Sequence, residues 1–236
     1  DGSRAFVPAD KMVVTGYPVR PDIRAAAALS RAQALARFDL TPERPALFVF
    51  GGSRGARNIN RALMAALPAL LVDTQVIHVS GTLTWPEVEA NAAGLSPTLR
   101  AYYRPFPYLH EEMGAAFRAA DLVLARAGAS MLGEGPAFGL PAILVPLTFA
   151  WRYQKVNADY LTERGAAVEL TDETLAETLL PAVRGLLADR DKLARMAAAA
   201  AALDRPQAAT DLARVILQTA SPTHRAHTTL PREEAS

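Results

Sequence analysis

The sequence contains no cysteine and no hydrophobic run long enough to span a membrane. The lack of cysteine excludes disulfide frameworks, thiolate nucleophiles and cysteine-ligated metals, and it fits a reducing compartment. A membrane-spanning helix needs about 20 consecutive apolar residues, and the first residues also lack the basic and apolar segments of a signal peptide. The sequence therefore predicts a soluble, cytoplasmic protein with no transmembrane segment.

An excess of charge of either sign is missing as well. Lys and Arg number 25 against 24 Asp and Glu, which gives a net charge of +1. Because surfaces that bind nucleic acid broadly are strongly basic, we expect no nucleic acid among the partners. What the chain does have is apolar residues, which make up 50% of 236 and allow a substantial core.

Short apolar runs of strand length alternate with segments of helical spacing along most of the chain. The runs are MVVT (12–15), ALFVF (46–50), QVIHV (75–79), LRAYYRPF (99–106), DLVLA (121–125), PAILVPL (141–147) and AAVEL (166–170). Such runs are typical of parallel strands that are covered on both faces. The pattern predicts an α/β fold with a Rossmann-like, doubly wound parallel sheet. Residues 171–218 predict only helices, which we expect on the flank of the sheet.

A glycine-rich loop, GGSRG (51–55), directly follows the apolar run at 46–50. Ligands of an open parallel sheet bind at the carboxyl ends of its strands, where this loop is expected. The loop has neither the GxGxxG spacing of a dinucleotide fold nor the GK[ST] ending of a P-loop. Its glycines could merely permit a sharp turn, or its N–H groups and the Ser53 hydroxyl could bind an anion. The residues alone leave both interpretations open.

The segment RAGASMLGE (126–134) follows another predicted strand. Gly128 and Ala129 allow close approach by a ligand. We expect Glu134 about one and a half turns into the following helix, where its carboxylate could accept hydrogen bonds from ribose hydroxyls. The alternative is that Glu134 only stabilises the N-terminus of that helix.

Two amides, Gln154 and Asn157, lie three residues apart and are expected on one face of a helix. An amide can donate and accept at once, which suits the recognition of sugar hydroxyls. Helix capping or simple solvent exposure remains the alternative for both.

No convincing metal site is present in the sequence. DRD (189–191) has the Asp-x-Asp pattern of metal-dependent sugar transferases, but it joins two predicted helices far from any strand end, and Asp191 suits a helix N-cap. The four histidines form no ligand pair on a helix face. We therefore expect no metal and no cofactor.

Five segments form an ordered set that is more specific than any one of them: VTGYPVR (14–20), FGGSRGARNIN (50–60), ADLVLARAGASMLGE (120–134), GLPAILVPL (139–147) and QKVNADYL (154–161). This set resembles the C-terminal, donor-binding half of MurG-type glycosyltransferases, which belong to glycosyltransferase family 28 and have the two-domain GT-B fold. The family transfers N-acetylglucosamine from UDP-N-acetylglucosamine to undecaprenyl-diphospho-muramoyl-pentapeptide, a step of peptidoglycan synthesis.

The resemblance also implies a domain organisation. Residues 1–11 correspond to the linker from an N-terminal acceptor domain, and residues 12–220 to the UDP-sugar-binding domain. Because the chain begins with Asp1 and not Met, we expect a fragment that lacks the acceptor domain. The catalytic base and the membrane-facing patch belong to that domain, so no catalytic residue is expected here. The full-length protein is expected at the inner face of the cell membrane. Residues 221–236 have no apolar period and predict a disordered tail.

The resemblance implies a role for each matched residue. Arg20 corresponds to an arginine that neutralises the donor diphosphate, and Gly52 and Ser53 to the loop at the same phosphates. Glu134 corresponds to the ribose acceptor and Gln154 to a glutamine that contacts sugar hydroxyls. His110 falls where the main chain meets the uracil, and the loop around the nucleotide comprises Gly128, Ala129, Ser130 and Met131.

Three departures from the family concern the sugar specificity more than uridine binding, and one is the loop TFAWRY (148–153), which is shorter and more aromatic than in the family. Tyr17 stands where Asn is frequent, and Tyr153 where His or Gln is usual. Related transferases with other lipid acceptors share this half of the fold. A stand-alone nucleotide-binding module without transferase activity is a second hypothesis. A UDP-sugar epimerase is a third, but we find no second carboxylate beside Glu134 for its acid and base chemistry.

Overall fold

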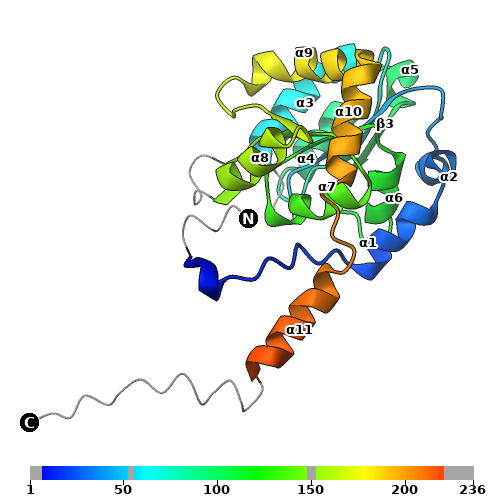
Figure 1. The fold of residues 1–236 in the computed structure, drawn as a ribbon. Helices are drawn as coiled ribbons and strands as arrows, with labels where there is room; N and C mark the ends of the chain where they lie inside the picture. The colour runs from blue at the N-terminus through cyan, green and yellow to red at the C-terminus, as the bar shows by residue number, and fades with distance from the viewer. Residues whose placement is uncertain (1–6, 53–55, 148–152, 221–236) are drawn as a thin grey trace, which may run out of the picture.

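The computed structural model describes residues 7–52, 56–147 and 153–220. Six parallel strands form one sheet in the order β3-β2-β1-β4-β5-β6 (Figure 1). The strands are β1 (Ala46–Phe50), β2 (Gln75–Val79), β3 (Tyr103–Phe106), β4 (Leu122–Ala125), β5 (Ala142–Leu144) and β6 (Ala167–Glu169). The order reverses between β1 and β4, so the expected doubly wound sheet is confirmed, and this switch point is where ligands of such sheets bind.

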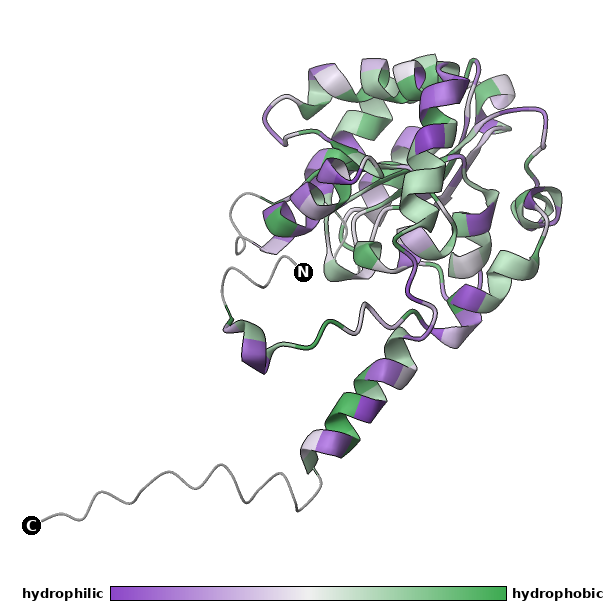
Figure 2. Ribbon diagram, in the orientation of Figure 1, coloured by the Kyte–Doolittle hydropathy of each residue, from purple (hydrophilic) through white to green (hydrophobic). Residues whose placement is uncertain are grey.

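Helices with apolar segments lie on both sides of the sheet (Figure 2). The side chains of β1 are all buried and alternate between the two faces. Leu47 and Val49 pack with α3, α4 and α9, whereas Phe48 and Phe50 pack with α1, α2, α6 and α8. The helices are α1 (Pro21–Ala25), α2 (Arg31–Ala36), α3 (Arg57–Leu70), α4 (Trp85–Ala93), α5 (Pro97–Arg100), α6 (Met113–Ala119), α7 (Glu134–Ala137), α8 (Tyr153–Glu163), α9 (Leu175–Ala188), α10 (Arg190–Ala201) and α11 (Ala208–Ala220). The described residues also form the 3₁₀ turns η2 (Ala9–Lys11), η3 (Ala26–Ala28) and η4 (Ala129–Leu132).

Two of the predicted strands differ in the structure. Residues 12–15 pair with no strand of the described chain, and Val13 is 64% exposed, so the prediction of a strand there is wrong. The run at 99–106 begins as helix α5, because Ser96 accepts a hydrogen bond from the Leu99 N–H and Pro97 suits the first helical position. Only its second half forms β3.

The C-terminal helices behave in two ways. Helix α9 packs on α3, and α10 packs on α7 and α9, as expected of helices on the flank of the sheet. Helix α11 instead points away from the body (Figure 1), with Ala208 buried and Ile216 58% exposed. The flank prediction is therefore wrong for α11. The predicted tail, residues 221–236, lies outside the described residues.

Membrane crossing needs a long apolar helix. Within the described ranges, no helix combines the length and hydropathy that this requires.

Candidate functional site

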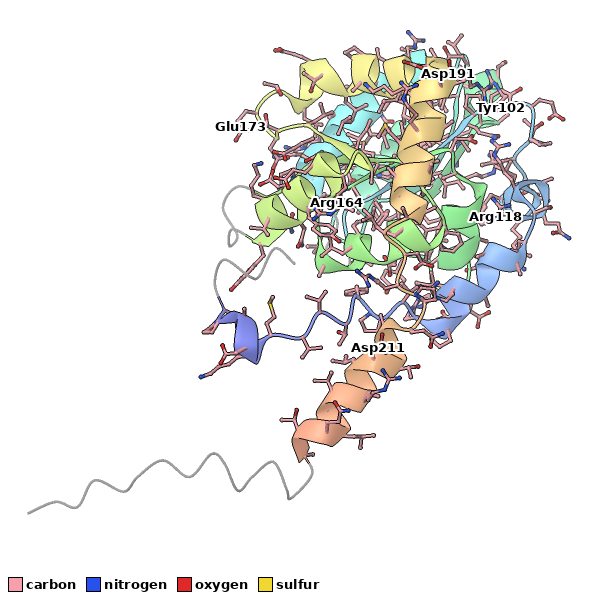
Figure 3. All side chains as sticks on the ribbon, viewed as in Figure 1. Tyr102, Arg118, Arg164, Glu173, Asp191 and Asp211 are labelled. Carbon is pink, nitrogen blue, oxygen red and sulfur yellow. The ribbon has the colours of Figure 1, made fainter. Side chains whose placement is uncertain are left out.

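The carboxyl ends of β1, β4 and β5 border a cavity of about 540 Å³. Its lining comes from the segments that follow four strands, β1, β4, β5 and β6, and Figure 3 labels one lining residue, Glu173. The described residues that line it are Gly51, Ala56, Arg57, Asn58, Arg126, Leu147, Gln154, Asp172 and Glu173. The expected place for a ligand is thus a hollow surface with charged and amide groups.

The N-terminus of α3 opens into this cavity. Its N-cap residue, Ala56, has no side chain that can accept a hydrogen bond, and the first turn contains no acidic residue. The N–H groups of a first helical turn have no partner within the helix, and the helix dipole makes this end attractive to anions. Gly52 has a φ of 84°, a value that favours glycine, so the sharp turn is present. Ser53 lies outside the described residues.

The loop after β4 approaches the same edge. A Cβ built on Gly128 meets no atom within 4 Å, so the surface beside it is open. The chain then forms the short turn η4, breaks at Gly133, and starts α7 at Glu134. The prediction of Glu134 one and a half turns into a single helix is therefore wrong, since it is the first residue of a four-residue helix.

The entering segment brings Arg20 to Glu134. A Cβ on Gly133 would lie 2.9 Å from atoms of Tyr17, so the lack of a side chain at Gly133 lets this segment pack closely. Burial raises the pKa of Glu134, while a hydrogen bond with the Ser130 side chain and the positive charge of Arg20 oppose that rise. Arg20 itself is exposed and lies 3.4 Å from Asp22. A cation and a half-buried carboxylate thus face the same edge.

The two predicted amides both bind the main chain. Gln154 accepts a hydrogen bond at Oε1 from the Leu147 N–H, at 2.9 Å. Because a backbone N–H can only donate, this assigns the carbonyl end of Gln154 and leaves its Nε2 group to donate to a ligand. Asn157 donates from Nδ2 to the carbonyl of Ala127 at 3.0 Å, so its amino group supports the loop before η4.

Three further predicted site residues differ in exposure. Ala129 is exposed at the edge. Met131 is 1% exposed, so its side chain belongs to the core and only its main chain can face a ligand. His110 is exposed in the connection after β3, with its ring centroid 4.6 Å from that of Tyr108.

A buried ion pair at the cavity was not predicted from the sequence. Arg126 donates from Nη1 to Asp172 Oδ2 at 2.9 Å and to the carbonyl of Val145 at 3.1 Å. Its side chain is 8% exposed and that of Asp172 is 12% exposed. The pair therefore joins the ends of β4 and β5 to the connection after β6. An Arg directly after a buried strand was the available signal, but its partner lies 46 residues away.

The predicted N-cap in DRD is two positions off. Asp189 caps α10 by accepting from the Lys192 N–H at 2.9 Å, while Asp191 lies in the first turn. Figure 3 labels Asp191 well away from Glu173, which lines the cavity. Among the residues that the structure describes, no group of three or more His, Asp or Glu side chains could hold a metal ion.

Comparisons with known proteins agree on one family. The model for the glycosyltransferase family 28 C-terminal domain matches residues 46–212. A curated relative from Roseiflexus sp. (strain RS-1) is 42% identical over 86% of this chain and 50% of its own length. One from Acidothermus cellulolyticus (strain ATCC 43068 / DSM 8971 / 11B) is 42% identical over 89% of this chain and 57% of its own length. Both are named UDP-N-acetylglucosamine--N-acetylmuramyl-(pentapeptide) pyrophosphoryl-undecaprenol N-acetylglucosamine transferase.

A comparison with solved structures points to the same family. The crystal structure of Acinetobacter baumannii MurG matches with a TM-score of 0.67 and 26% identity, over 86% of this chain and 57% of that chain. The chain thus spans about half the length of the curated relatives it matches. Its sheet is the Rossmann-like half of a GT-B glycosyltransferase. Since the family model covers most of the described residues, the chain belongs to glycosyltransferase family 28 and represents its C-terminal domain.

Proposed function

We propose that this chain is the donor-binding half of an inverting glycosyltransferase. The whole enzyme moves N-acetylglucosamine from UDP-N-acetylglucosamine to a lipid-linked muramoyl-pentapeptide in peptidoglycan synthesis, as the names of its relatives indicate. The observation that carries this proposal is the N-terminus of α3, which opens into the cavity at the switch point and whose N-cap residue, Ala56, has no side-chain acceptor. An anionic leaving group such as a nucleoside diphosphate fits that position.

The diphosphate lies against the glycine-rich loop and the first turn of α3. The N–H groups of this turn, the Ser53 hydroxyl and the Arg20 guanidinium stabilise the negative charge that grows on UDP as the glycosidic bond breaks. Hydrogen-bond donors and a cation aimed at the leaving group take the role that a divalent cation has in metal-dependent transferases. We therefore propose a metal-independent reaction.

The nucleoside lies toward η4 and α7. The carboxylate of Glu134 accepts hydrogen bonds from the ribose diol, and the open surface beside Gly128 and Ala129 admits the ring. The main chain at His110 meets the uracil. Support comes from the shared edge of the sheet on which these residues lie, and from the charge of Arg20 close to Glu134.

The transferred sugar lies in the cavity beside Gln154. Since Leu147 occupies the Oε1 atom of that amide, the side chain donates from Nε2 to a sugar oxygen. The acceptor and the base that deprotonates it belong to the N-terminal half of the enzyme, which residues 1–11 connect to this domain. That half also carries the enzyme to the cytoplasmic face of the membrane.

Calorimetric titration of the chain with UDP in the presence of EDTA tests the proposal. We expect saturable binding without added metal. Absence of binding at millimolar UDP, or binding that appears only with a divalent cation, contradicts it. A thermal-shift comparison of UDP-N-acetylglucosamine, UDP-glucose and UDP-galactose then tests the sugar, with the largest shift expected for the first.

Arg20 offers a test with a matched control. We expect Arg20→Ala to weaken UDP binding about tenfold or more, because it removes a charge-assisted contact to phosphate. Arg195→Ala removes an exposed arginine of α10 and should leave the affinity unchanged. Equal effects of the two substitutions would show that only net charge matters.

A further inference from the structure

A buried polar network lies directly beneath the first turn of α3. Asn60, in that turn, donates from Nδ2 to the carbonyl of Ser80 at 2.8 Å and to the Thr84 hydroxyl at 2.6 Å. Its Oδ1 lies 3.0 Å from Nε2 of His78. All four residues are buried. Every polar atom of the Asn60 side chain is thus engaged away from solvent.

The donor and acceptor of each hydrogen bond to His78 can be assigned. The Oδ1 atom of Asn60 can only accept, so Nε2 of His78 carries the hydrogen. Nδ1 of His78 is then an acceptor, and the Tyr103 hydroxyl donates to it at 2.7 Å. Burial lowers the pKa of His78 to about 3, so the ring is neutral near pH 7. A charged ring would carry a hydrogen at Nδ1 as well, facing the Tyr103 oxygen.

The network connects the phosphate side of the site to two neighbouring strands. Tyr103 lies on β3, His78 on β2, and Thr84 is the N-cap residue of α4. Asn60 donates from its backbone N–H to the carbonyl of Ala56 at 2.9 Å, so it belongs to the same turn as the N–H groups that open into the cavity. Fixing Asn60 fixes that turn.

Hydrogen bonds explain why this position is polar at all. An apolar side chain at His78 would fill the space between β2 and α3, but it would not set the rotation or height of the helix end. Hydrogen bonds are directional, and a fully satisfied buried network specifies one arrangement of the elements that it joins. The arrangement here places a helix N-terminus relative to the end of β1.

We propose that His78 is a positioning residue for the donor diphosphate. Through Asn60 it holds the N-terminal turn of α3 where the N–H groups of that turn meet the phosphates, and Tyr103 orients its ring. This rests on the proposed function, because it assigns the diphosphate to α3. His78 does not touch the donor, so its removal should change the affinity for phosphates and spare the affinity for the nucleoside.

Two ligands separate positioning from folding. UDP and uridine are titrated into the 236-residue chain and followed by amide NMR shifts. We expect His78→Leu to raise the Kd of UDP about tenfold and the Kd of uridine by less than about twofold, because only UDP uses the helix end. His78→Gln should restore most of the UDP affinity, since its side-chain amide can donate to Asn60 Oδ1.

A buried substitution on the opposite face of the sheet provides the control. Leu35→Ala removes packing from α2 and lowers stability, but it should leave both dissociation constants unchanged. Tyr103→Phe, which keeps the ring, should raise the Kd of UDP less than His78→Leu. This milder variant keeps the test decisive if His78→Leu does not fold.

The outcomes are distinct. An unchanged UDP affinity in both network variants, or equal losses for UDP and uridine, overturns the positioning role while the proposed function stands. A wild-type chain that binds uridine and UDP equally well contradicts the diphosphate site itself, and with it this inference. As a second measurement, the ¹⁵N shifts of His78 should show a neutral ring protonated at Nε2 down to about pH 4.5. Titration near pH 6.5 overturns the network as described.

Discussion

The His78 network and the Arg126–Asp172 ion pair lie at the same edge of one sheet, but they are satisfied to different degrees. In the network, His78 and Asn60 use every side-chain polar atom in a hydrogen bond. In the ion pair, Arg126 Nε and Asp172 Oδ1 are buried without a hydrogen-bond partner in the described chain. The network is neutral and fully hydrogen-bonded, so it fixes the positions of its residues without burying a charge. In the ion pair each charge needs the opposite charge of its partner, because an unpaired buried charge lowers the stability of the fold.

The largest expected effect comes from breaking the ion pair. Asp172→Ala leaves the Arg126 guanidinium buried without its carboxylate, and this should lower the free energy of unfolding by about 3 to 5 kcal/mol. Urea denaturation measures the change. The matched control is Asp211→Ala, which breaks an exposed pair with Arg214 and should cost less than about 1 kcal/mol. Similar losses in the two variants would mean that burial does not set the value of the pair.

The second effect concerns the network and pH. The pKa of His78 is about 3 in the folded chain and about 6.5 when unfolded, so only the unfolded state binds a proton between these values. Stability should therefore fall as the pH falls through 6.5, by about 1.4 kcal/mol per pH unit from this residue. We expect His78→Gln to lose this contribution. Urea denaturation of both proteins between pH 7.5 and 4.5 gives the difference, and parallel pH profiles would contradict the assignment.

The sequence predicted the fold better than it predicted the His78 network or the Arg126–Asp172 ion pair. Strand β1 and helix α3 show the reason. The run ALFVF and the helical spacing after it depend on neighbours in the sequence, and the structure has both elements. The switch point then follows from the strand order. Residues 12–15 are also mostly apolar, yet they pair with no strand of the described chain, because pairing depends on the neighbouring segments and not on local composition alone.

In the candidate site, too, contacts between residues distant in the sequence could not be predicted. Predictions for the edge loops could be made because parallel strands bring their carboxyl ends together. Glu134 was misplaced because Gly133 divides the helix, and Tyr17, which packs closely against Gly133, is distant in the sequence. His78 appeared only as a polar residue in an apolar strand. Its partners, Asn60 and Tyr103, lie 18 and 25 residues away, and no local pattern connects them.

A smaller effect is expected when the network loses its outermost member. Tyr103→Phe keeps the ring but leaves Nδ1 of His78 without a donor, which should cost about 1 to 2 kcal/mol of unfolding free energy. Tyr102→Phe is the neighbouring control, because that half-buried ring packs against Arg44 and lies on the opposite side of the molecule from Glu173 in Figure 3. It should change stability by less than about 0.5 kcal/mol. A cost at Tyr102 as large as that at Tyr103 would show that the hydroxyl bond adds nothing.

The smallest effect on stability is expected at Glu134, where the effect on binding is large. Because burial raises the pKa of Glu134, its charged form is disfavoured in the folded chain, and stability from this group falls as the pH rises through its titration. Glu134→Gln removes the charge and should leave the melting temperature nearly unchanged at pH 7.5. The affinity for UDP should fall about tenfold, since a neutral amide accepts ribose hydroxyls less strongly than a carboxylate.

The pH dependence of UDP binding tests whether the charged form of Glu134 strengthens the affinity. As the pH falls through the raised pKa of Glu134, the wild-type chain loses the carboxylate, and its UDP affinity should approach that of Glu134→Gln. Protonation of the UDP phosphates affects both proteins equally, so the ratio of their affinities isolates Glu134. Calorimetry at several pH values measures this ratio. A large drop in melting temperature with unchanged UDP affinity would instead assign Glu134 to the N-terminus of α7, where its carboxylate stabilises the helix and contacts no ligand.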